Sequence, residues 1–563
     1  MGKKIIVLPP EVVNKIAAGE VVERPASVVK ELIENSLDAE ANLIVVEIKD
    51  AGRKMIKVID NGVGMSKEDA LLCIKPHATS KISSVEDLEK ISTLGFRGEA
   101  LSSIASVSLM RILTHNEEEP SGIELEIEAG EIRKVSEIGA PRGTTIEVRN
   151  IFFNTPARKK FLKSQSTELA HIIRIVEQFA LAYPQVAFRL LHQERELFNF
   201  LPQKNYRERI KEVLGEEAEK ELLELDFQNN NFKLKGFISK PEFSRIDRYG
   251  QFFFVNRRAV VNKTLSHAVY SIYKELLPKE RFPLAIIHIE IEPRFVDVNV
   301  HPTKKEIRFQ NEKLIHDCLV KVIKEALTEK SSLISESSQK TFSISQEGVK
   351  EGVPSYTLFK HDVSPEVREL AFSEIFPSRK IPFLQVSNLY IVSSDDEGIL
   401  IIDQHAASER IIFDALLKKD NITEVQSLLI PEVINLGVRE SEILRENLDT
   451  FRELGFEIRE FGKNDFQIKT VPAVISKSPK QLILDILSDI QEEKINTLKL
   501  EREKLISLIA CHSAIREGDR LEEVEIYRLI QDLKNTKFPS VCPHGRPTMI
   551  RLGWDELKKR FKR

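Results

Sequence analysis

Two polar side chains one helical turn apart could support metal-assisted hydrolysis. Glu31 and Asn35 lie four residues apart in the segment 30–39, whose apolar residues follow helical spacing, so both side chains share one helix face. A carboxylate can orient and deprotonate a water molecule, and an amide oxygen one turn away can bind a hard cation such as Mg²⁺. Such pairs are also common on solvated helix faces, so this pair alone leaves both interpretations open.

Glycine-containing segments downstream have the residues of a phosphate-binding pocket. Residues 60–65, Asp-Asn-Gly-Val-Gly-Met, follow a strand-like run, where a buried Asp60 could accept a hydrogen bond from an adenine amino group. Residues 95–101, Gly-Phe-Arg-Gly-Glu-Ala-Leu, form a glycine-flanked loop that opens a helix and could offer backbone N–H groups to phosphates. His-Ala-Thr-Ser-Lys at 77–81 and Gly-Thr-Thr at 143–145 accompany them. Taken singly, a D-x-G-x-G string such as residues 60–64 is most often merely a turn.

A second group, in the last third of the chain, has side chains of metal-ligand type. Asp403 and His405 follow an apolar run and are expected at a strand end, with Glu409 on the first turn of the next helix. Thiolate, imidazole and carboxylate together suit a borderline-soft divalent metal such as zinc. No C-x-x-C is present, which argues against a structural zinc finger, and each cysteine alone is more typical of buried core. The cysteine and histidine residues of two later segments are Cys511, His512, Cys542 and His544.

Alternating strand and helix patterns must position these residues, which predicts an α+β or α/β class. Strand-like runs are followed by a second strand-rich unit at roughly 225–309 and a helix at 311–328. Residues 331–356 hold eight serines and no sustained apolar periodicity, which predicts a flexible linker. The expected strands are Leu43–Ile48, Lys57–Asp60, Ile146–Val148, Phe252–Val255, Leu284–Ile291 and, as a strand-rich region, Phe383–Ile402. The expected helices are Pro25–Leu37, Ser166–Ala182, Ala407–Lys418, 477–492, 498–517 and 522–534.

Length and composition exclude several classes of protein. A chain of 563 residues predicts three or four domains. With 42% hydrophobic and 30% charged residues and no run of 18 apolar residues, neither a disordered chain nor a membrane protein is expected, and a cytoplasmic location is. Four cysteines are too few for a disulfide framework. The net charge of −4 argues against a general nucleic-acid coat, although local basic patches could still bind a phosphate backbone.

The four N-terminal segments, in this order, resemble the Bergerat-type ATP site shared by gyrase B, the ninety-kilodalton heat-shock chaperones, histidine kinases and MutL. Longer strings at 16–25, 95–101 and 153–158 resemble the MutL family of DNA mismatch-repair proteins in particular. The resemblance covers residues 1–330 and resumes after the linker. It implies an α+β chain with an α/β-sandwich ATPase domain at 1–215, a transducer domain at 216–330, a linker at 331–378, and a C-terminal dimerisation and endonuclease domain at 379–563.

The resemblance assigns roles in binding and hydrolysing ATP. Glu31 would be the general base, Asn35 a Mg²⁺ ligand, and Asp60 the residue that recognises adenine. Lys304, in the string 297–304, would contact the γ-phosphate, although an exposed lysine is the plain alternative. Arg258 would bind DNA, with a surface arginine as its alternative. The other residues expected to line the nucleotide are Gly64, Thr79, Gly95, Phe96, Arg97, Gly98 and Thr145.

The C-terminal residues resemble the endonuclease site of MutL proteins that nick DNA themselves. The family pattern D-Q-H-A-x-x-E-x-x-x-x-E is matched through Glu409, but Asp414 stands where the last Glu is expected, which puts the role of that position in doubt. Asp403 and Glu409 would be catalytic, and Zn²⁺ and/or Mn²⁺ would activate the attacking water. The implied metal ligands are Asp403, His405, Glu409, Cys511, Cys542 and His544.

Residues 426–431, Gln-Ser-Leu-Leu-Ile-Pro, resemble the motif with which nicking MutL proteins bind the sliding clamp (β subunit). Gln426, Leu428 and Pro431 would carry the contact, and a plain edge strand ended by proline is the alternative. The implied partners are DNA, the mismatch sensor MutS, the clamp and a second copy of the chain. The leading hypothesis is an ATP-regulated DNA-nicking enzyme. The alternatives are an ATP-driven clamp and matchmaker without nuclease activity, and a gyrase-like topoisomerase or chaperone.

Overall fold

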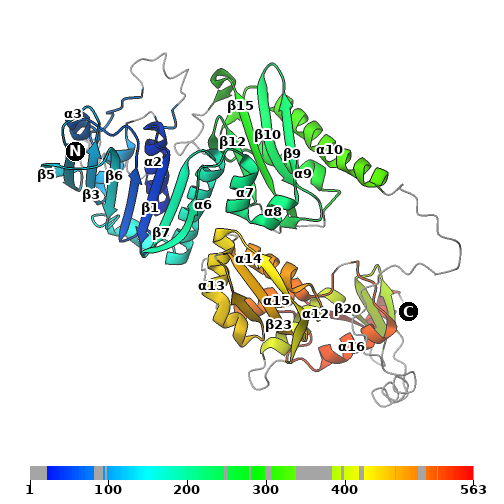
Figure 1. Cartoon of the computed structure of the whole chain (residues 1–563). Coiled ribbons are helices and arrows are strands. Elements are labelled where there is room, and N and C mark those ends of the chain that lie inside the picture. The colour runs from blue at the N-terminus through cyan, green and yellow to red at the C-terminus, as the bar shows by residue number, and fades with distance from the viewer. Residues whose placement is uncertain are drawn as a thin grey trace, which may run out of the picture. The chain divides into compact units, whose positions relative to one another are not determined.

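The computed structural model divides the chain into two compact units, which are described separately (Figure 1). The first unit contains residues 1–339 with 435–446 and 488–499, and the second contains 340–434, 447–487 and 500–563. The described helices include none that is long and apolar enough to span a membrane. Both units mix helices and sheets, which confirms the predicted α+β class. The structure describes residues 22–81, 93–95, 98–245, 248, 250–277, 281–297, 307–337, 383–394, 398–417, 424–462, 464–491, 502–516 and 518–561.

An eight-stranded sheet, in the order β5-β4-β3-β6-β2-β1-β7-β8, forms the N-terminal part of the first unit. Neighbouring strands are antiparallel except for β1 and β7, which run parallel. Helix α2 (Pro25–Asp38) packs on β1 and β2, helix α6 (Gln165–Ala182) packs on β7, and the two helices contact each other. The strands are β1 Leu43–Lys49, β2 Met55–Asp60, β3 Leu109–His115, β4 Gly122–Glu128, β5 Glu131–Ile138, β6 Gly143–Arg149, β7 Ala187–His192 and β8 Arg195–Phe200.

Helix α2 places the first candidate pair beside the sheet because its apolar residues lie on one side. Pro25 begins the helix, where its missing N–H leaves no intrahelical hydrogen bond unmade. In β1 every second side chain is buried, as expected for a strand packed on one face by helices. Glu31 and Asn35 therefore emerge at the edge of the buried face. The buried apolar residues of α2 are Val28, Val29, Leu32 and Ile33.

A five-stranded sheet, in the order β13-β12-β15-β10-β9, follows in the same unit. Helices α9 (Lys263–Tyr273) and α10 (Glu312–Ser337) pack on each other and cover a single apolar core with this sheet. Helix α10 runs through Ser337, so the first residues of the predicted linker are helical; residues 338–382 lie outside the described part. The strands are β9 Leu222–Gln228, β10 Phe232–Ser239, β12 Gln251–Val255, β13 Arg258–Val260 and β15 Ala285–Ile291.

The C-terminal part has a four-stranded sheet, β18-β19-β20-β24, and a three-stranded sheet, β21-β23-β22. Helix α12 (Gln404–Leu417) follows β20 directly and contacts α15 and α16. It begins before the predicted start at Ala407, because the Asp403 carboxylate accepts a hydrogen bond from the Ala406 N–H (3.0 Å) and caps the helix. The remaining elements are β18 Phe383–Val386, β19 Tyr390–Ser394, β20 Gly398–Asp403, β21 Val425–Asn435, α13 Val438–Glu453, β22 Glu457–Glu460, β23 Asp465–Pro472, α14 Pro479–Gln491, α15 Arg502–Ser513, α16 Glu523–Lys534, β24 Met549–Gly553 and α17 Trp554–Arg560.

Candidate nucleotide pocket and candidate metal centre

A cavity of about 790 Å³ opens beside α2 and the ends of β2 and β6. It is large enough for a nucleotide. In β6 the lining residues are Thr144 and Ile146 rather than Thr145, since adjacent strand residues face opposite sides. Phe96, Arg97 and Lys304 lie outside the described residues. The predicted residues that line the cavity are Glu31, Asn35, Asp60, Gly64, Thr79, Gly95 and Gly98.

Charged side chains surround the predicted base and the predicted Mg²⁺ ligand. Lys30 forms ion pairs with Glu31 (3.3 Å) and Glu34 (3.0 Å). The Lys81 ammonium donates a hydrogen bond to Asn35 Oδ1 (3.0 Å). The Lys81 ammonium therefore lies next to the amide oxygen that was predicted to bind Mg²⁺. This face of α2 carries charged groups that could bind a charged ligand.

Asp60, at the end of β2, is held by three donors. Its Oδ1 accepts hydrogen bonds from the N–H groups of Gly62 (2.9 Å) and Thr144 (3.2 Å), and its Oδ2 accepts one from the Ser36 hydroxyl (2.8 Å). Burial raises the pKa of Asp60, while these donors work in the opposite direction. The carboxylate is thus fixed in one orientation at the cavity wall, as an acceptor for an adenine amino group would need to be.

Asp38 is a pocket residue that the sequence reading missed. Its two carboxylate oxygens accept hydrogen bonds from the N–H groups of Leu94 (2.9 Å) and Gly95 (3.0 Å), and Oδ2 also pairs with Lys81 (2.5 Å). Asp38 thereby ties the start of the glycine-flanked loop to the end of α2. Helical spacing carried the signal, because Asp38 lies three residues after Asn35 on the same face.

Gly98 allows two loops around the cavity to meet. Its φ is +64°, and a Cβ at this position would lie 2.5 Å from the Ala78 carbonyl oxygen. The Gly98 carbonyl accepts a hydrogen bond from the His77 N–H (3.0 Å). The segments 77–81 and 98–101, which were predicted to belong to one site, are therefore in direct contact.

A candidate metal centre forms where α12 meets the loop before β24. Glu409, Cys542 and His544 offer ligand atoms that all lie within 4.8 Å of one another. Glu409 Oε2 is 3.3 Å from His544 Nδ1, and Glu409 Oε1 is 3.3 Å from His405 Nε2. Burial opposes ionisation of Glu409, but His405, His544 and Cys542 together lower its pKa to about 2. A thiol, an imidazole and an ionised carboxylate that converge in this way suit a divalent transition metal.

The other predicted ligands lie around this cluster in different roles. His405 is on α12, not at the strand end as predicted, and its Nδ1 is 2.8 Å from the Ile515 carbonyl oxygen. Asp403 caps α12, as described above. Cys511, on α15, is outside the one three-residue group found among the described residues.

Asp414, which replaces the glutamate of the family pattern, belongs to a buried ion pair. Its Oδ1 pairs with Arg410 Nη1 (2.9 Å), and its Oδ2 accepts a hydrogen bond from the Lys537 N–H (2.6 Å). Arg410 Nε also donates to the Val541 carbonyl (2.7 Å), the residue before Cys542. Asp414 and Arg410 thus fix the loop that carries Cys542 and His544.

The predicted clamp motif lies on β21, an edge strand of the three-stranded sheet. Gln426 and Pro431 are exposed and Leu428 is partly buried. Leu429 and Ile430, between them, are fully and 82% exposed. The other partner-binding prediction, Arg258, is on β13, and its guanidinium donates a hydrogen bond to the Thr93 carbonyl beside the nucleotide cavity.

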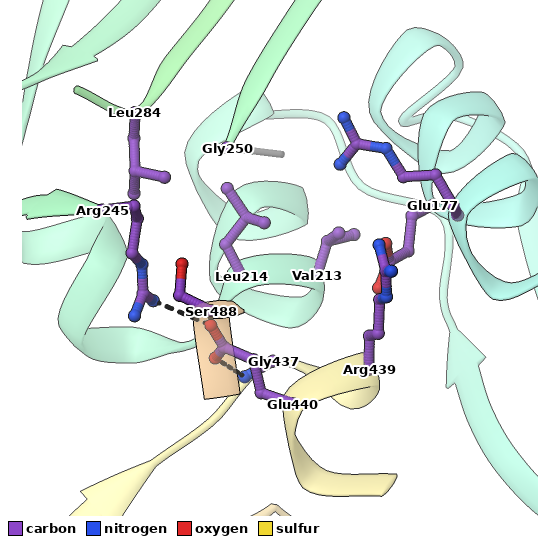
Figure 2. A pocket seen from close by; sticks show the side chains of 11 residues that line it. Glu177, Val213, Leu214, Arg245, Gly250, Leu284, Gly437, Arg439, Glu440 and Ser488 are labelled. Atoms are coloured by element: carbon purple, nitrogen blue, oxygen red, sulfur yellow. Dashed lines mark hydrogen bonds and ion pairs between the residues drawn. The ribbon is translucent and has the colours of Figure 1, made fainter. Parts of the chain in front are cut away.

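A smaller pocket in the first unit contains closely spaced charges (Figure 2). The figure shows Glu177 beside Arg439 and the Arg245 guanidinium directed at Glu440, at 3.1 Å. Glu440 also accepts a hydrogen bond from the Gly437 N–H (3.2 Å). Burial raises the pKa of Glu177 to about 7, against the charges of Arg174 and Arg439. Arg245 pairs with Glu440, and Arg174 and Arg439 act electrostatically on Glu177, so we assign the pocket a structural role.

Comparisons with known proteins agree with this arrangement. The family described as histidine kinase-, DNA gyrase B- and HSP90-like ATPase matches residues 23–152, the C-terminal domain of DNA mismatch repair protein matches 210–328, and the MutL C terminal dimerisation domain matches 383–521. A DNA mismatch repair protein MutL from Endomicrobium trichonymphae is 39% identical over 99% of this chain and 100% of its own length. The MutL of Syntrophotalea carbinolica is 38% identical over 100% of both. The crystal structure of the N terminal domain of a DNA repair protein is 27% identical, with a TM-score of 0.50, over 57% of this chain and 99% of that one.

The eight-stranded sheet and the cavity beside α2 therefore define an ATPase of the histidine kinase, gyrase B and HSP90 class, which is joined to a dimerisation domain. The two MutL relatives, 38% and 39% identical over the whole or nearly the whole chain, identify the family within this class. The chain belongs to the MutL family of DNA mismatch repair proteins, as its motifs predicted.

Proposed function

We propose that this protein is an ATP-regulated, metal-dependent endonuclease that nicks DNA in mismatch repair, in response to mismatch recognition by MutS. The convergence of Glu409, Cys542 and His544 carries this proposal. Glu409 is more than 130 positions away from Cys542 and His544 in the sequence, and Glu409 itself is the last residue of the resembled nuclease motif at 403–409. A matchmaker without nuclease activity would have no use for such a donor set.

In the nucleotide pocket, Glu31 would deprotonate the attacking water and Asn35 would hold Mg²⁺ on the ATP phosphates. Asp60 supports adenine recognition through its fixed orientation. Lys304 keeps its predicted role as the contact to the γ-phosphate. The predicted roles of Phe96 and Arg97 likewise stay proposals, while on β6 Thr144, which lines the cavity, takes the role that was predicted for Thr145.

In the metal centre, Glu409, Cys542 and His544 would hold Zn²⁺ or Mn²⁺, and Asp403, His405 and Cys511 remain predicted ligands. When bound, the metal would supply an activated water for attack on a phosphodiester. The bond between His405 Nδ1 and the Ile515 carbonyl fixes the imidazole so that Nε2 faces Glu409. These residues fit such a metal because their ligand atoms converge and are of the right chemical types. Thiolate and imidazole favour zinc, and the carboxylates also suit manganese.

The partners follow from the same assignment. We propose that DNA reaches the metal centre within a homodimer in the cytoplasm. We also propose that the sliding clamp binds β21 through Gln426, Leu428 and Pro431. The exposed Leu429 and Ile430 support a protein-binding surface on this strand, because an edge strand that carries exposed apolar residues is suited to pairing.

Nicking of supercoiled plasmid with Mn²⁺ tests the proposal. Loss of a hydrogen-bonding partner around a metal typically costs 10–100-fold, so loss of a direct ligand in Cys542→Ser or His544→Ala should lower nicking by at least ~100-fold. Bound zinc, measured by mass spectrometry, should fall in parallel, while ATP turnover stays unchanged. Cys318→Ser is the matched control, since Cys318 lies on α10 in the first unit.

The matchmaker alternative makes the opposite prediction. Nicking that is unchanged in Cys542→Ser, His544→Ala and Asp403→Asn would be due to a contaminating nuclease and would overturn the endonuclease proposal. ATP hydrolysis would be retained in either case, so the two halves of the assignment fail independently.

A further inference from the structure

The first unit contains a nucleotide domain, built on the eight-stranded sheet, and a second domain, built on the five-stranded sheet. A tight hairpin in the second domain directs an arginine toward the nucleotide domain. Strands β12 and β13 are joined by Asn256 and Arg257, whose φ values of +49° and +65° are those of a two-residue hairpin turn. Asn256 bonds to β15 at three points, through its N–H to Ile289 O (2.9 Å) and through its side-chain amide to both main-chain groups of Ile291 (2.8 and 2.9 Å). The hairpin is therefore fixed to the central part of its sheet.

Arg258, the first residue of β13, points into the nucleotide domain and is half-buried. Its Nη2 donates a hydrogen bond to the Thr93 carbonyl, and its Nη1 is buried without a hydrogen-bond partner among the described residues. The carboxylates of Glu34 and Asp38 and the phenol of Tyr183 are the ionisable groups that interact with it. Arg258 stays protonated in this setting, because a guanidinium does not lose its proton in proteins.

Its neighbour Arg257 differs from Arg258 in exposure and in contacts. Arg257 is exposed and lies over the Tyr183 ring at 5.9 Å. A phosphate backbone can reach an exposed guanidinium, whereas Arg258 is half-buried and its Nη2 already donates to the Thr93 carbonyl inside the protein. The two adjacent arginines therefore have separate roles, and Arg257 is a natural control.

The segment that Arg258 contacts belongs to the ATP pocket. Leu94 and Gly95 donate their N–H groups to Asp38, and the Thr93 hydroxyl donates to the Gly95 carbonyl (2.8 Å). Gly95 lines the nucleotide cavity. Residues 93–95 are thus held by the Asp38 carboxylate of α2 and by the Arg258 guanidinium of the second domain.

We propose that Arg258 is a positioning residue of the ATP site, which couples the second domain to the nucleotide pocket through the segment 93–95. The role rests on the ATPase activity of the site and is independent of the nuclease proposal. When Arg258 holds the Thr93 carbonyl, the Gly95 backbone stands in place before ATP arrives. Without it, binding ATP must first order that segment, so the loss falls on nucleotide affinity more than on the chemical step.

Steady-state ATPase kinetics of the full-length chain test this role. A hydrogen bond to a charged group contributes ~1.5–3 kcal/mol, so Arg258→Ala should raise KM for ATP by at least ~10-fold. We expect kcat to fall by no more than ~3-fold, on the argument that Arg258 touches no reacting atom. Arg258→Lys, which retains one donor for Thr93, should restore most of the affinity. Arg257→Ala should leave KM within ~2-fold.

Two further measurements separate the proposal from its alternatives. Duplex-DNA affinity without nucleotide, from fluorescence anisotropy, should be unchanged in Arg258→Ala; a loss of DNA affinity with a normal KM would overturn the proposal in favour of DNA binding. Thr93→Ala keeps the carbonyl that Arg258 contacts but removes the hydroxyl bond to Gly95, which orders the same segment. In a double-mutant cycle the two effects on KM should therefore be less than multiplicative. Fully multiplicative effects, or equal losses in the alanine and lysine variants, would reduce Arg258 to a structural role and would also overturn it.

Discussion

At the scale of single residues, replacement of Glu31, the proposed general base of the nucleotide pocket, should separate nucleotide binding from hydrolysis. Glu31→Gln should lower kcat for ATP by at least ~100-fold, because a general base contributes 10²–10⁴-fold in the transition state. The affinity for a non-hydrolysable ATP analogue should change by less than ~3-fold, since the base contributes little in the ground state. Radiolabelled phosphate release and analogue titration measure the two quantities. Glu40→Gln, two residues beyond α2 and solvent-exposed, is the matched control, and full turnover in the Glu31 variant would contradict the assignment.

The sequence predicted the residues of this pocket better than it predicted their partners. Asp60 could be placed from its position after a strand, because the end of a strand is a local feature. The bond between Lys81 and Asp38 joins positions 43 residues apart, and no local pattern indicates which acid a lysine will meet. The direction of Arg258 depends on a hairpin and a domain contact together, so the sequence could not indicate its bond to the Thr93 carbonyl.

At the scale of secondary-structure elements, strand β15 contains a histidine that should make the second domain sensitive to acid. The His288 ring is stacked on Phe254 (4.6 Å between centroids) and lies 4.7 Å from Tyr206, with Nε2 unpaired among the described groups. Burial lowers the pKa of His288 to about 3. In the folded chain the ring is therefore neutral at pH values where the unfolded chain takes up a proton.

This difference fixes the sign of the pH dependence. The stabilisation by neutral His288 is fully present above the unfolded pKa near 6.5 and is lost as pH falls toward 3, at about 1.4 kcal/mol per pH unit. At pH 5.0 the second domain should be ~2 kcal/mol less stable than at pH 7.0. Hydrogen exchange of the β10 and β15 amides measures this locally. His288→Phe should flatten the dependence, whereas the exposed His267→Phe should not; an unchanged slope in the His288 variant would contradict the buried-neutral assignment.

The sequence predicted which segments form helices and strands better than it predicted where each of them begins and ends. The periodicity of α2, α6, β12 and β15 located each within one or two residues, because their apolar faces pack against sheets or helices. The start of α12 was misplaced because Asp403 was interpreted only as a metal ligand, whereas its side chain also caps the helix. An aspartate before a helix can be a cap, a metal ligand or both, and the sequence pattern alone does not distinguish these roles.

At the scale of the whole molecule, the dimerisation domain presents an apolar row that a second copy would cover. Leu384, Val392, Ile401 and Ile550 are successive cross-strand partners in β18, β19, β20 and β24, so they lie on one face of the sheet. Ile391 and Ile402 are buried on the opposite face, against the helices. Leu384 and Ile550 are 64% and 56% exposed in the single chain. A continuous apolar row on an uncovered sheet face is typical of an interface between subunits.

Ile550→Lys should therefore convert the dimer into a monomer. In a two-fold symmetric interface each substitution is present twice, so two lysines would be buried without a partner, which would cost several kcal/mol. Light scattering should then report about 64.4 kDa, the mass of one chain, rather than twice that value. Phe461→Lys is the control, because Phe461 is 63% exposed in the loop after β22 and lies outside this sheet. The zinc that we propose at this site should persist in the monomer, since Glu409, Cys542 and His544 belong to one chain. If the Ile550 variant remained dimeric, the subunits would have to meet through a different surface.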